Sequence, residues 1–128
     1  MQNLDQIRAA AALPAAAAEK TTKQAVSKLP AMIIANGLLA TAAFADEHKN
    51  ESEPKRKEMK NAMDAVAGHL ANPVHGMAIL NGCKDCRTLI ERLTRAPATS
   101  LDLQRATTEA LAFLAYVKRF ATKEEKEA

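Results

Sequence analysis

The sequence predicts an all-α fold, a compact single-domain bundle of about five to six helices. Three observations support this fold class. Glycine and proline are scarce, at 4 and 5 residues of 128, β-branched residues are sparse, and no alternation of apolar and polar residues persists. Hydrophobic residues make up 48% of the chain. A chain of this length buries well over half of its unfolded surface without disulfides or metals. We expect one domain over residues 1–122 and a charged C-terminal stub over 123–128.

Prolines mark the expected helix boundaries. Pro14, Pro30 and Pro54 can each occupy the first turn of a helix, where a backbone N–H is not needed. Pro73 and Pro97 fall in connecting loops. The sequence therefore predicts helices near residues 3–13, 15–27, 30–48, 54–70, 83–95 and 101–122, of which the first two could be one kinked helix.

The segment from Lys28 to Phe44 predicts the core helix, because it is too apolar for a surface helix. It is also too short to span a bilayer, which needs about 20 consecutive apolar residues, and Asn36, Gly37 and Thr41 interrupt it. Asn36 must be hydrogen-bonded if it is buried. Glycine inside a helix costs roughly 1 kcal/mol relative to alanine, so Gly37 indicates a closely packed neighbouring backbone or a local bend.

The helix expected after Pro54 is the clearest amphipathic segment. Its apolar residues follow the i, i+3, i+4, i+7 spacing of one buried face, namely Met59, Ala62, Met63, Val66, Ala67 and Leu70. Basic residues cluster at its start, where the helix dipole disfavours positive charge. Arg56, Lys57 and Lys60 therefore form either a solvated face neutralised by nearby acids or a set of phosphate contacts.

The last expected helix carries two apolar stripes, which predict a central position in the bundle. One stripe holds Leu103, Ala106, Ala110, Leu114 and Val117, and the other holds Phe113, Tyr116 and Phe120. On the remaining face we expect an i,i+4 ion pair between Arg105 and Glu109. Lys118 and Arg119 lie near the C-terminus, where the dipole favours cations, so a structural role and an RNA contact are both open.

Three blocks of the chain resemble a known family. They are NLDQIRA at residues 3–9, KLPAMIIANGLLATAAF at 28–44 and ATTEALAFLAYVKRFA at 106–121. Together they are similar to the small α-helical subunit of the type III-B CRISPR effector, the Cmr complex. The resemblance implies a subunit that is not the nuclease, whose copies stack into a filament beside the backbone subunits and help to hold guide RNA and target RNA.

The residues themselves agree with sequence-independent binding to a nucleic-acid backbone. The net charge is +3 and the pI is about 9.0, with only 3% aromatic residues on which bases could stack. Cations at exposed helix faces would neutralise phosphates. Our candidates for RNA contact are Lys20, Lys23, Lys28, Arg56, Lys60, Lys118 and Arg119. Arg8, which also lies in a resembling block, could instead form a structural ion pair between helices.

The competing hypothesis is a helical protein–protein adaptor without direct RNA contact, in which the lysines only maintain solubility. Catalytic residues are not apparent, because the chain lacks a Gly-rich phosphate loop and a nucleophile elbow. A zinc site could be drawn from Cys83, Cys86, His69 and His75, but their spacing is not typical of structural zinc sites. We expect core thiols instead, and no metal or cofactor.

Cysteine usage and the N-terminus indicate a cytoplasmic protein. The chain has two cysteines, no charged segment leading into an apolar signal region and no lipidation motif. These features predict a reducing compartment and no membrane partner.

Overall fold

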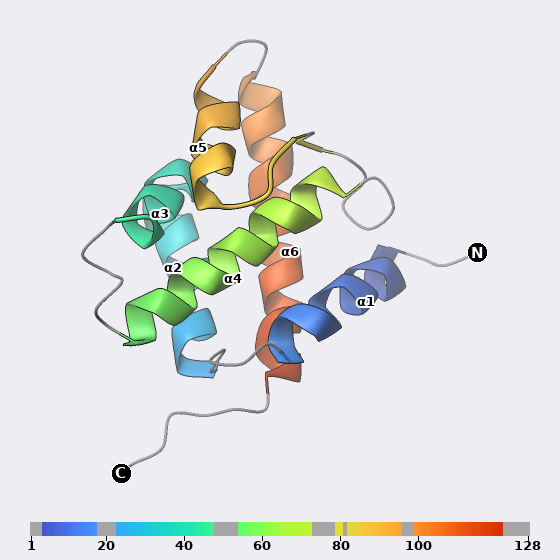
Figure 1. Ribbon diagram of the computed structural model, residues 1–128. Helices are drawn as coiled ribbons and strands as arrows, with labels where there is room; N and C mark the ends of the chain where they lie inside the picture. Colours follow the sequence, from blue (N-terminus) through green and yellow to red (C-terminus); the bar gives the residue numbers. More distant parts are fainter. Residues whose placement is uncertain are drawn as a thin grey trace.

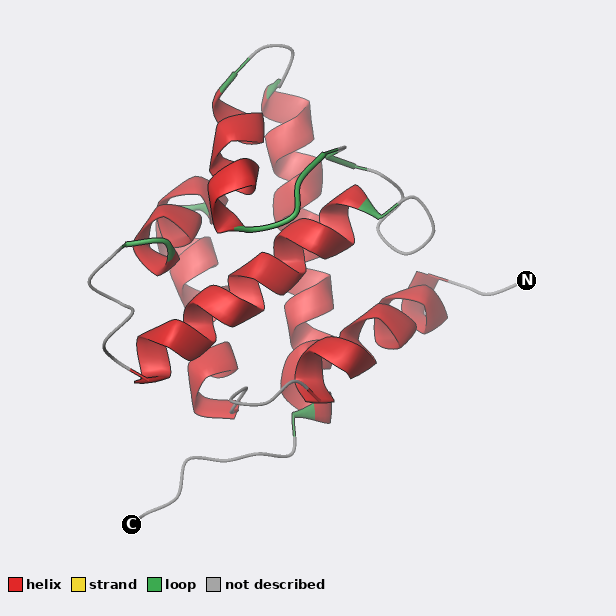
Figure 2. Ribbon diagram, viewed as in Figure 1, coloured by secondary structure: helices red, strands yellow, loops and turns green. Residues whose placement is uncertain are grey.

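Most of the chain that the computed structural model describes, residues 4–17, 23–47, 54–72, 79–80, 82–95 and 99–121, is helical. Within these ranges there is no strand (Figure 2). The six helices are α1 Leu4–Ala17, α2 Lys23–Asn36, α3 Leu38–Ala45, α4 Pro54–Ala71, α5 Cys86–Thr94 and α6 Ser100–Phe120. The predicted all-α class is confirmed. None of the helices in these ranges is long and apolar enough to cross a membrane.

Helix α6 is the central element, as its two apolar stripes predict. It packs against α1, α2 and α4. On the side of the bundle away from α1, α3 and α5 pack against each other and against α4 (Figure 1). Its fully buried residues include Phe113, Leu114 and Val117, each at most 1% exposed. All six residues of the apolar face predicted for α4 are also buried, which confirms that assignment.

Two of the three predicted proline boundaries are wrong. Pro54 begins α4 as expected, but Pro14 lies inside α1 and Pro30 lies inside α2. A proline inside a helix removes one backbone hydrogen bond and costs about 3 kcal/mol. Burial of apolar residues on both sides of each proline, such as Val26 and Ile33 around Pro30, offsets this cost because it holds the helix against its neighbours.

The expected single helix over residues 30–48 is interrupted at Gly37. This residue has φ +96°, and a Cβ added there would meet nothing within 4 Å. The bend is therefore confirmed and the closely packed backbone is not. The Gly37 N–H still donates to the Ile33 oxygen at 2.8 Å, and the Thr41 N–H donates to the Gly37 oxygen at 3.1 Å, so the break costs few backbone bonds.

The segment that we expected to be wholly buried is buried on one face only. Leu29, Ile33 and Leu38 are at most 2% exposed, whereas Ile34 is 75% exposed and Asn36 is exposed as well. Asn36 therefore needs no buried hydrogen bond. The core of the bundle takes one face of α2 and α3, and the other face, which includes Lys28 and Ile34, is in contact with solvent.

Helix α5 begins at Cys86 rather than at Cys83, because Asp85 caps it. The Asp85 carboxylate accepts the Thr88 N–H at 2.9 Å, and the Thr88 hydroxyl accepts the Asp85 N–H at 3.0 Å. This reciprocal pair is a capping box. Asp64 of α4 adds a second cap, since its Oδ1 accepts the Cys86 N–H at 2.8 Å.

Candidate nucleic-acid interface and buried ion cluster

Three of the predicted RNA-contact residues are exposed on neighbouring helices. Lys28 lies in the first half of α2, and Lys118 and Arg119 lie in the last turn of α6. The two helices pack against each other, and Figure 1 shows these two segments at the same end of the molecule. None of the three makes an ion pair with a side chain in the described ranges. The structure therefore places at the same end of the molecule cations that are about 90 residues apart in sequence.

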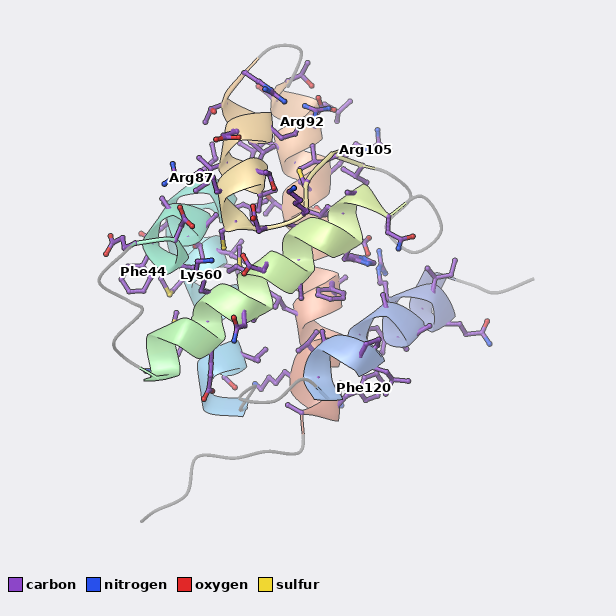
Figure 3. The ribbon with its side chains drawn as sticks, viewed as in Figure 1. Phe44, Lys60, Arg87, Arg92, Arg105 and Phe120 are labelled. Carbon is purple, nitrogen blue, oxygen red and sulfur yellow. The ribbon has the colours of Figure 1, made fainter. Side chains whose placement is uncertain are left out.

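Lys60 is half-buried and has a structural partner. Its Nζ lies 3.5 Å from Oδ2 of Asp64, the same carboxylate that caps α5 (Figure 3). Partial burial opposes the charge of the ammonium, but the Asp64 carboxylate outweighs this effect and raises the pKa of Lys60. Lys60 thus contributes to the contact between α4 and α5, whether or not it also meets a phosphate.

The side chains of the other three candidates lie outside the described part of the structure. Lys20 lies outside the described residues. Lys23 begins α2 and Arg56 lies in the first turn of α4, but their side chains are not described.

Sequence reasoning passed over a second group of cations, on α5, on the loop before it and on the first half of α6. Lys84, Arg95 and Arg105 are exposed, and none makes an ion pair with a described residue. Arg105 and the half-buried Arg92 lie at the end of the molecule opposite to the start of α2 (Figures 1 and 3). The local excess of basic residues from position 84 to position 119 is the sequence signal that could have identified them.

Arg87 belongs to neither group of unpaired cations. Its Nη2 lies 3.1 Å from Oδ2 of Asp46, the C-cap residue of α3. The pair ties α5 to the end of α3.

A buried ion cluster joins α1, α4 and α6. Arg8 donates to Glu109 through Nε at 2.9 Å and through Nη2 at 2.8 Å, and His69 Nε2 lies 2.9 Å from Glu109 Oε2. The side chains of Glu109 and His69 are 3% and 1% exposed, and that of Arg8 is 17% exposed. Arg8 is therefore a structural residue. The predicted pair between Arg105 and Glu109 is wrong, because Glu109 points into the bundle and Arg105 points to solvent.

The cluster keeps the Glu109 carboxylate ionised. Burial alone would raise its pKa, but the hydrogen bonds from His69 and Arg8 and the charge of Arg8 lower it to about 2. The hydrogen bond to Glu109 outweighs the effect of burial on Arg8, so the pKa of Arg8 is raised. Both groups of the pair are therefore held in their charged forms.

His69 has one satisfied nitrogen and one orphaned nitrogen. An ionised carboxylate only accepts hydrogen bonds, so Nε2 carries a proton and donates to Glu109. Nδ1 is buried and has no hydrogen-bond partner. The imidazole stacks on Phe113, with ring centroids 4.4 Å apart and an angle of 13° between the planes.

The two cysteines are core thiols, as predicted. Cys83 is 5% exposed and Cys86 is 0% exposed, and both are free. Burial raises the pKa of both thiols. Of the remaining zinc candidates, His69 is engaged by Glu109 and His75 lies outside the described residues. The described ranges contain no group of three or more His, Cys, Asp or Glu residues that could hold a metal ion.

Comparison with known protein families shows to which family the chain belongs. A family model described as CRISPR-associated protein (Cas_Cmr5) matches residues 3–124 of the 128. Comparisons with curated proteins and with solved structures give no match. The family match extends from α1 to beyond α6 and so includes both the buried ion cluster and the exposed cations. The chain therefore belongs to the Cas_Cmr5 family of CRISPR-associated proteins, the small subunits of the type III-B Cmr effector complex.

Proposed function

We propose that this chain is a non-catalytic subunit that helps to hold guide RNA and target RNA through sequence-independent contacts with the phosphate backbone. We also propose that several copies stack into a filament with the other subunits of the effector in the cytoplasm. The observation that carries the RNA proposal is that Lys28, Lys118 and Arg119 are exposed at one end of the fold and form no ion pair with a described residue. Cations in such positions neutralise phosphates and release counterions.

The aromatic residues support binding through the backbone rather than through the bases. Proteins that bind splayed single-stranded bases stack them on exposed aromatic rings. All four aromatic residues of this chain lie in the described ranges, and none is exposed: Phe113 is buried, and Phe44, Tyr116 and Phe120 are half-buried. Electrostatic attraction to phosphates is therefore the main contribution that a surface without exposed aromatic rings makes to RNA binding.

The roles of several acidic residues support a non-catalytic subunit. Asp85 and Asp102 cap α5 and α6, Asp64 caps α5 from α4, and Glu109 holds α1 on α6. Each of these carboxylates is engaged in a contact that stabilises the fold. We therefore assign them to structure rather than to acid–base chemistry.

Titration with labelled single-stranded RNA at two ionic strengths tests the RNA proposal. We expect weak binding with little sequence preference that falls steeply with salt. Reversing both charges, Lys118→Glu with Arg119→Glu, should reduce the slope of log affinity against log salt by about 1.4, since each lost contact to a single strand contributes about 0.7. Arg105→Glu is the control, because it reverses an exposed charge that forms no ion pair with a described residue, near the other end of the same helix.

The alternative function, a protein-binding adaptor, is favoured by the side chain of Ile34, which is 75% exposed within an uncharged stretch of sequence, residues 29–45. Large exposed apolar patches mark interaction sites. No measurable RNA binding at low salt would support the adaptor and contradict the RNA proposal. Equal weakening by Arg105→Glu would show that binding depends on net charge and not on this end of the fold.

A further inference from the structure

A shallow groove lies along the first half of α6, at the end of the fold opposite to the start of α2. On one side is the exposed face of α6, and on the other is the short stretch at residues 79–80 (Figure 1). The Leu80 N–H fixes this stretch to α4, because it donates to the Leu70 oxygen at 3.0 Å. The groove has a volume of about 320 Å³, and its lining residues are Ile79, Leu101, Gln104, Arg105, Thr108 and Glu109.

Four of the lining residues form one exposed stripe on α6. Leu101, Gln104, Arg105 and Thr108 follow the i, i+3, i+4, i+7 spacing of a single helix face, and all four are exposed. The opposite side of this helix is buried in the core. The stripe therefore presents one apolar group, two neutral polar groups and one cation in a fixed order on a rigid support.

Leu101 gives the groove an apolar part that the fold does not use. Its side chain is 60% exposed. The start of α6 is stabilised by Thr99 and Asp102, since the Asp102 N–H donates to Thr99 Oγ1 at 3.1 Å and the Thr99 N–H donates to Asp102 Oδ2 at 3.0 Å. Leu101 takes no part in this capping box. Together with the half-buried Ile79 it can bury an apolar side chain that comes from outside the chain.

Arg105 gives the groove a positive charge. It is exposed and forms no ion pair with a described residue. Glu109 is the acid among the lining residues, but its side chain is 3% exposed and lies 2.8 Å from Nη2 of Arg8. The charge of Glu109 is therefore already neutralised. A carboxylate from outside the chain is the complementary group for Arg105, because a guanidinium and a carboxylate form strong, charge-assisted hydrogen bonds.

We propose that this groove is a docking site for an acidic, amphipathic segment of another protein subunit of the effector complex. An aliphatic side chain of that segment fills the space between Ile79 and Leu101, and a neighbouring aspartate or glutamate pairs with Arg105. The inference rests on membership of the complex and not on RNA binding at the other end of the fold.

The apolar part of the groove favours a protein over RNA as the occupant. A phosphate would pair with Arg105 but would leave Ile79 and Leu101 uncovered. The lining residues include no aromatic ring on which a base could stack. A segment that combines an aliphatic side chain with a carboxylate meets both requirements.

A photo-crosslinking amino acid in place of Gln104 identifies the occupant. The full chain that carries it is assembled with the other subunits and the guide RNA, and then irradiated. We expect a covalent cross-link to a protein subunit, at a segment with aspartate or glutamate beside an aliphatic residue. The same amino acid in place of Asn61, which is exposed on α4 outside the groove, should not give this cross-link. A cross-link to RNA, or none in the assembled complex, would overturn the proposal.

Two substitutions separate the charge of the groove from its apolar part. Arg105→Glu should lower the affinity of the chain for the remaining subunits at least about tenfold, and Leu101→Ser about fivefold. Helical content and melting temperature should stay the same, because both side chains are exposed. Lys84→Glu and Leu13→Ser are matched controls, since they change an exposed cation and a 55% exposed leucine outside the groove, and should leave the affinity unchanged.

Charge exchange tests the pairing of Arg105 itself. Replacement of the cross-linked acidic residue of the partner by lysine should restore the affinity of Arg105→Glu, which a general effect of charge or stability would not do. Unchanged affinity in Arg105→Glu, equal losses in the two control variants, or absence of this rescue would each overturn the proposal. RNA binding by the isolated chain should be the same with and without Arg105→Glu, so a failure of the RNA proposal is seen separately.

Discussion

The buried ion cluster makes the most quantitative prediction about stability. Arg8→Met removes the guanidinium and retains most of the aliphatic volume of the side chain. Glu109 then remains buried at 3% exposure, and His69 is its remaining partner among the described residues. Removal of one partner from a buried pair costs about 3–5 kcal/mol.

The pKa of Glu109 gives a second estimate of the same quantity. Its ordinary value of 4.5 is lowered to about 2 in the fold. The difference of about 2.5 in pKa corresponds to about 3 kcal/mol, at 1.36 kcal/mol for each pKa unit. His69 contributes part of this stabilisation and Arg8 is partly exposed, so we expect Arg8→Met to lower the free energy of unfolding by about 2–3 kcal/mol.

Urea unfolding followed by circular dichroism measures this change, and its pH dependence tests the cause. Because the pKa of Glu109 is lowered by folding, its contribution is fully present above pH 4.5 and is lost as the pH falls from about 4.5 toward about 2. In Arg8→Met the loss of stability over this pH range should be smaller, because folding then lowers the pKa of Glu109 by less.

The control is Arg105→Met, which removes a solvent-exposed arginine. It should change the free energy of unfolding by less than about 0.5 kcal/mol. A double-mutant cycle with Glu109→Gln isolates the pairwise energy. An Arg8→Met protein as stable as the original, or an Arg105→Met protein equally destabilised, would refute the assignment of Arg8 as the partner of Glu109.

Further predictions concern the glycines, the thiols and metals. Gly37→Ala should destabilise the chain by about 1–3 kcal/mol in urea unfolding, because φ +96° with ψ 159° is a conformation that essentially only glycine adopts. Gly68→Ala should instead stabilise it by up to about 1 kcal/mol, and destabilisation there would contradict the open space around that residue. Cys83 and Cys86 should react with a thiol reagent only as fast as the chain unfolds, since both are buried with raised pKa values; rapid labelling of the native chain would contradict this. Chelators should leave helical content and melting temperature unchanged, and a lower melting temperature would revive the zinc hypothesis.

The family and the apolar helix faces are features that the sequence predicted correctly. The resemblance rested on three blocks, and the family match covers residues 3–124. The apolar residues on the buried faces of α4 and α6 were predicted, whereas the burial of Glu109 in α6 was not. Their spacing is a local signal that does not depend on which helix lies opposite.

Helix boundaries were predicted less well, for a physical reason that concerns proline. Pro54 begins a helix, whereas Pro14 and Pro30 lie inside helices. The local preference is the same at all three positions. Whether burial on both sides outweighs the lost hydrogen bond depends on the neighbouring helices, which the local sequence does not specify.

The candidate RNA-contact residues were predicted from charge and sequence position. Lys28, Lys118 and Arg119 are exposed as that interpretation requires, while Lys60 has Asp64 as a partner. The association of α2 with the end of α6 comes from packing between segments distant in the chain. The spacing of residues within a single helix contains no information on which helices will pack against each other.

The sequence by itself determined the helical class, the buried stripes and the family, because each depends on periodicity or on blocks of neighbouring residues. Tertiary structure alone decided that Glu109 pairs with Arg8, which is 101 positions away, rather than with Arg105 one turn before it. It likewise decided that residues 79–80 lie beside the first half of α6 and form a groove with Arg105. A partner for a buried charge is selected by the way helices are oriented around the core, and that orientation exists only after the chain has folded.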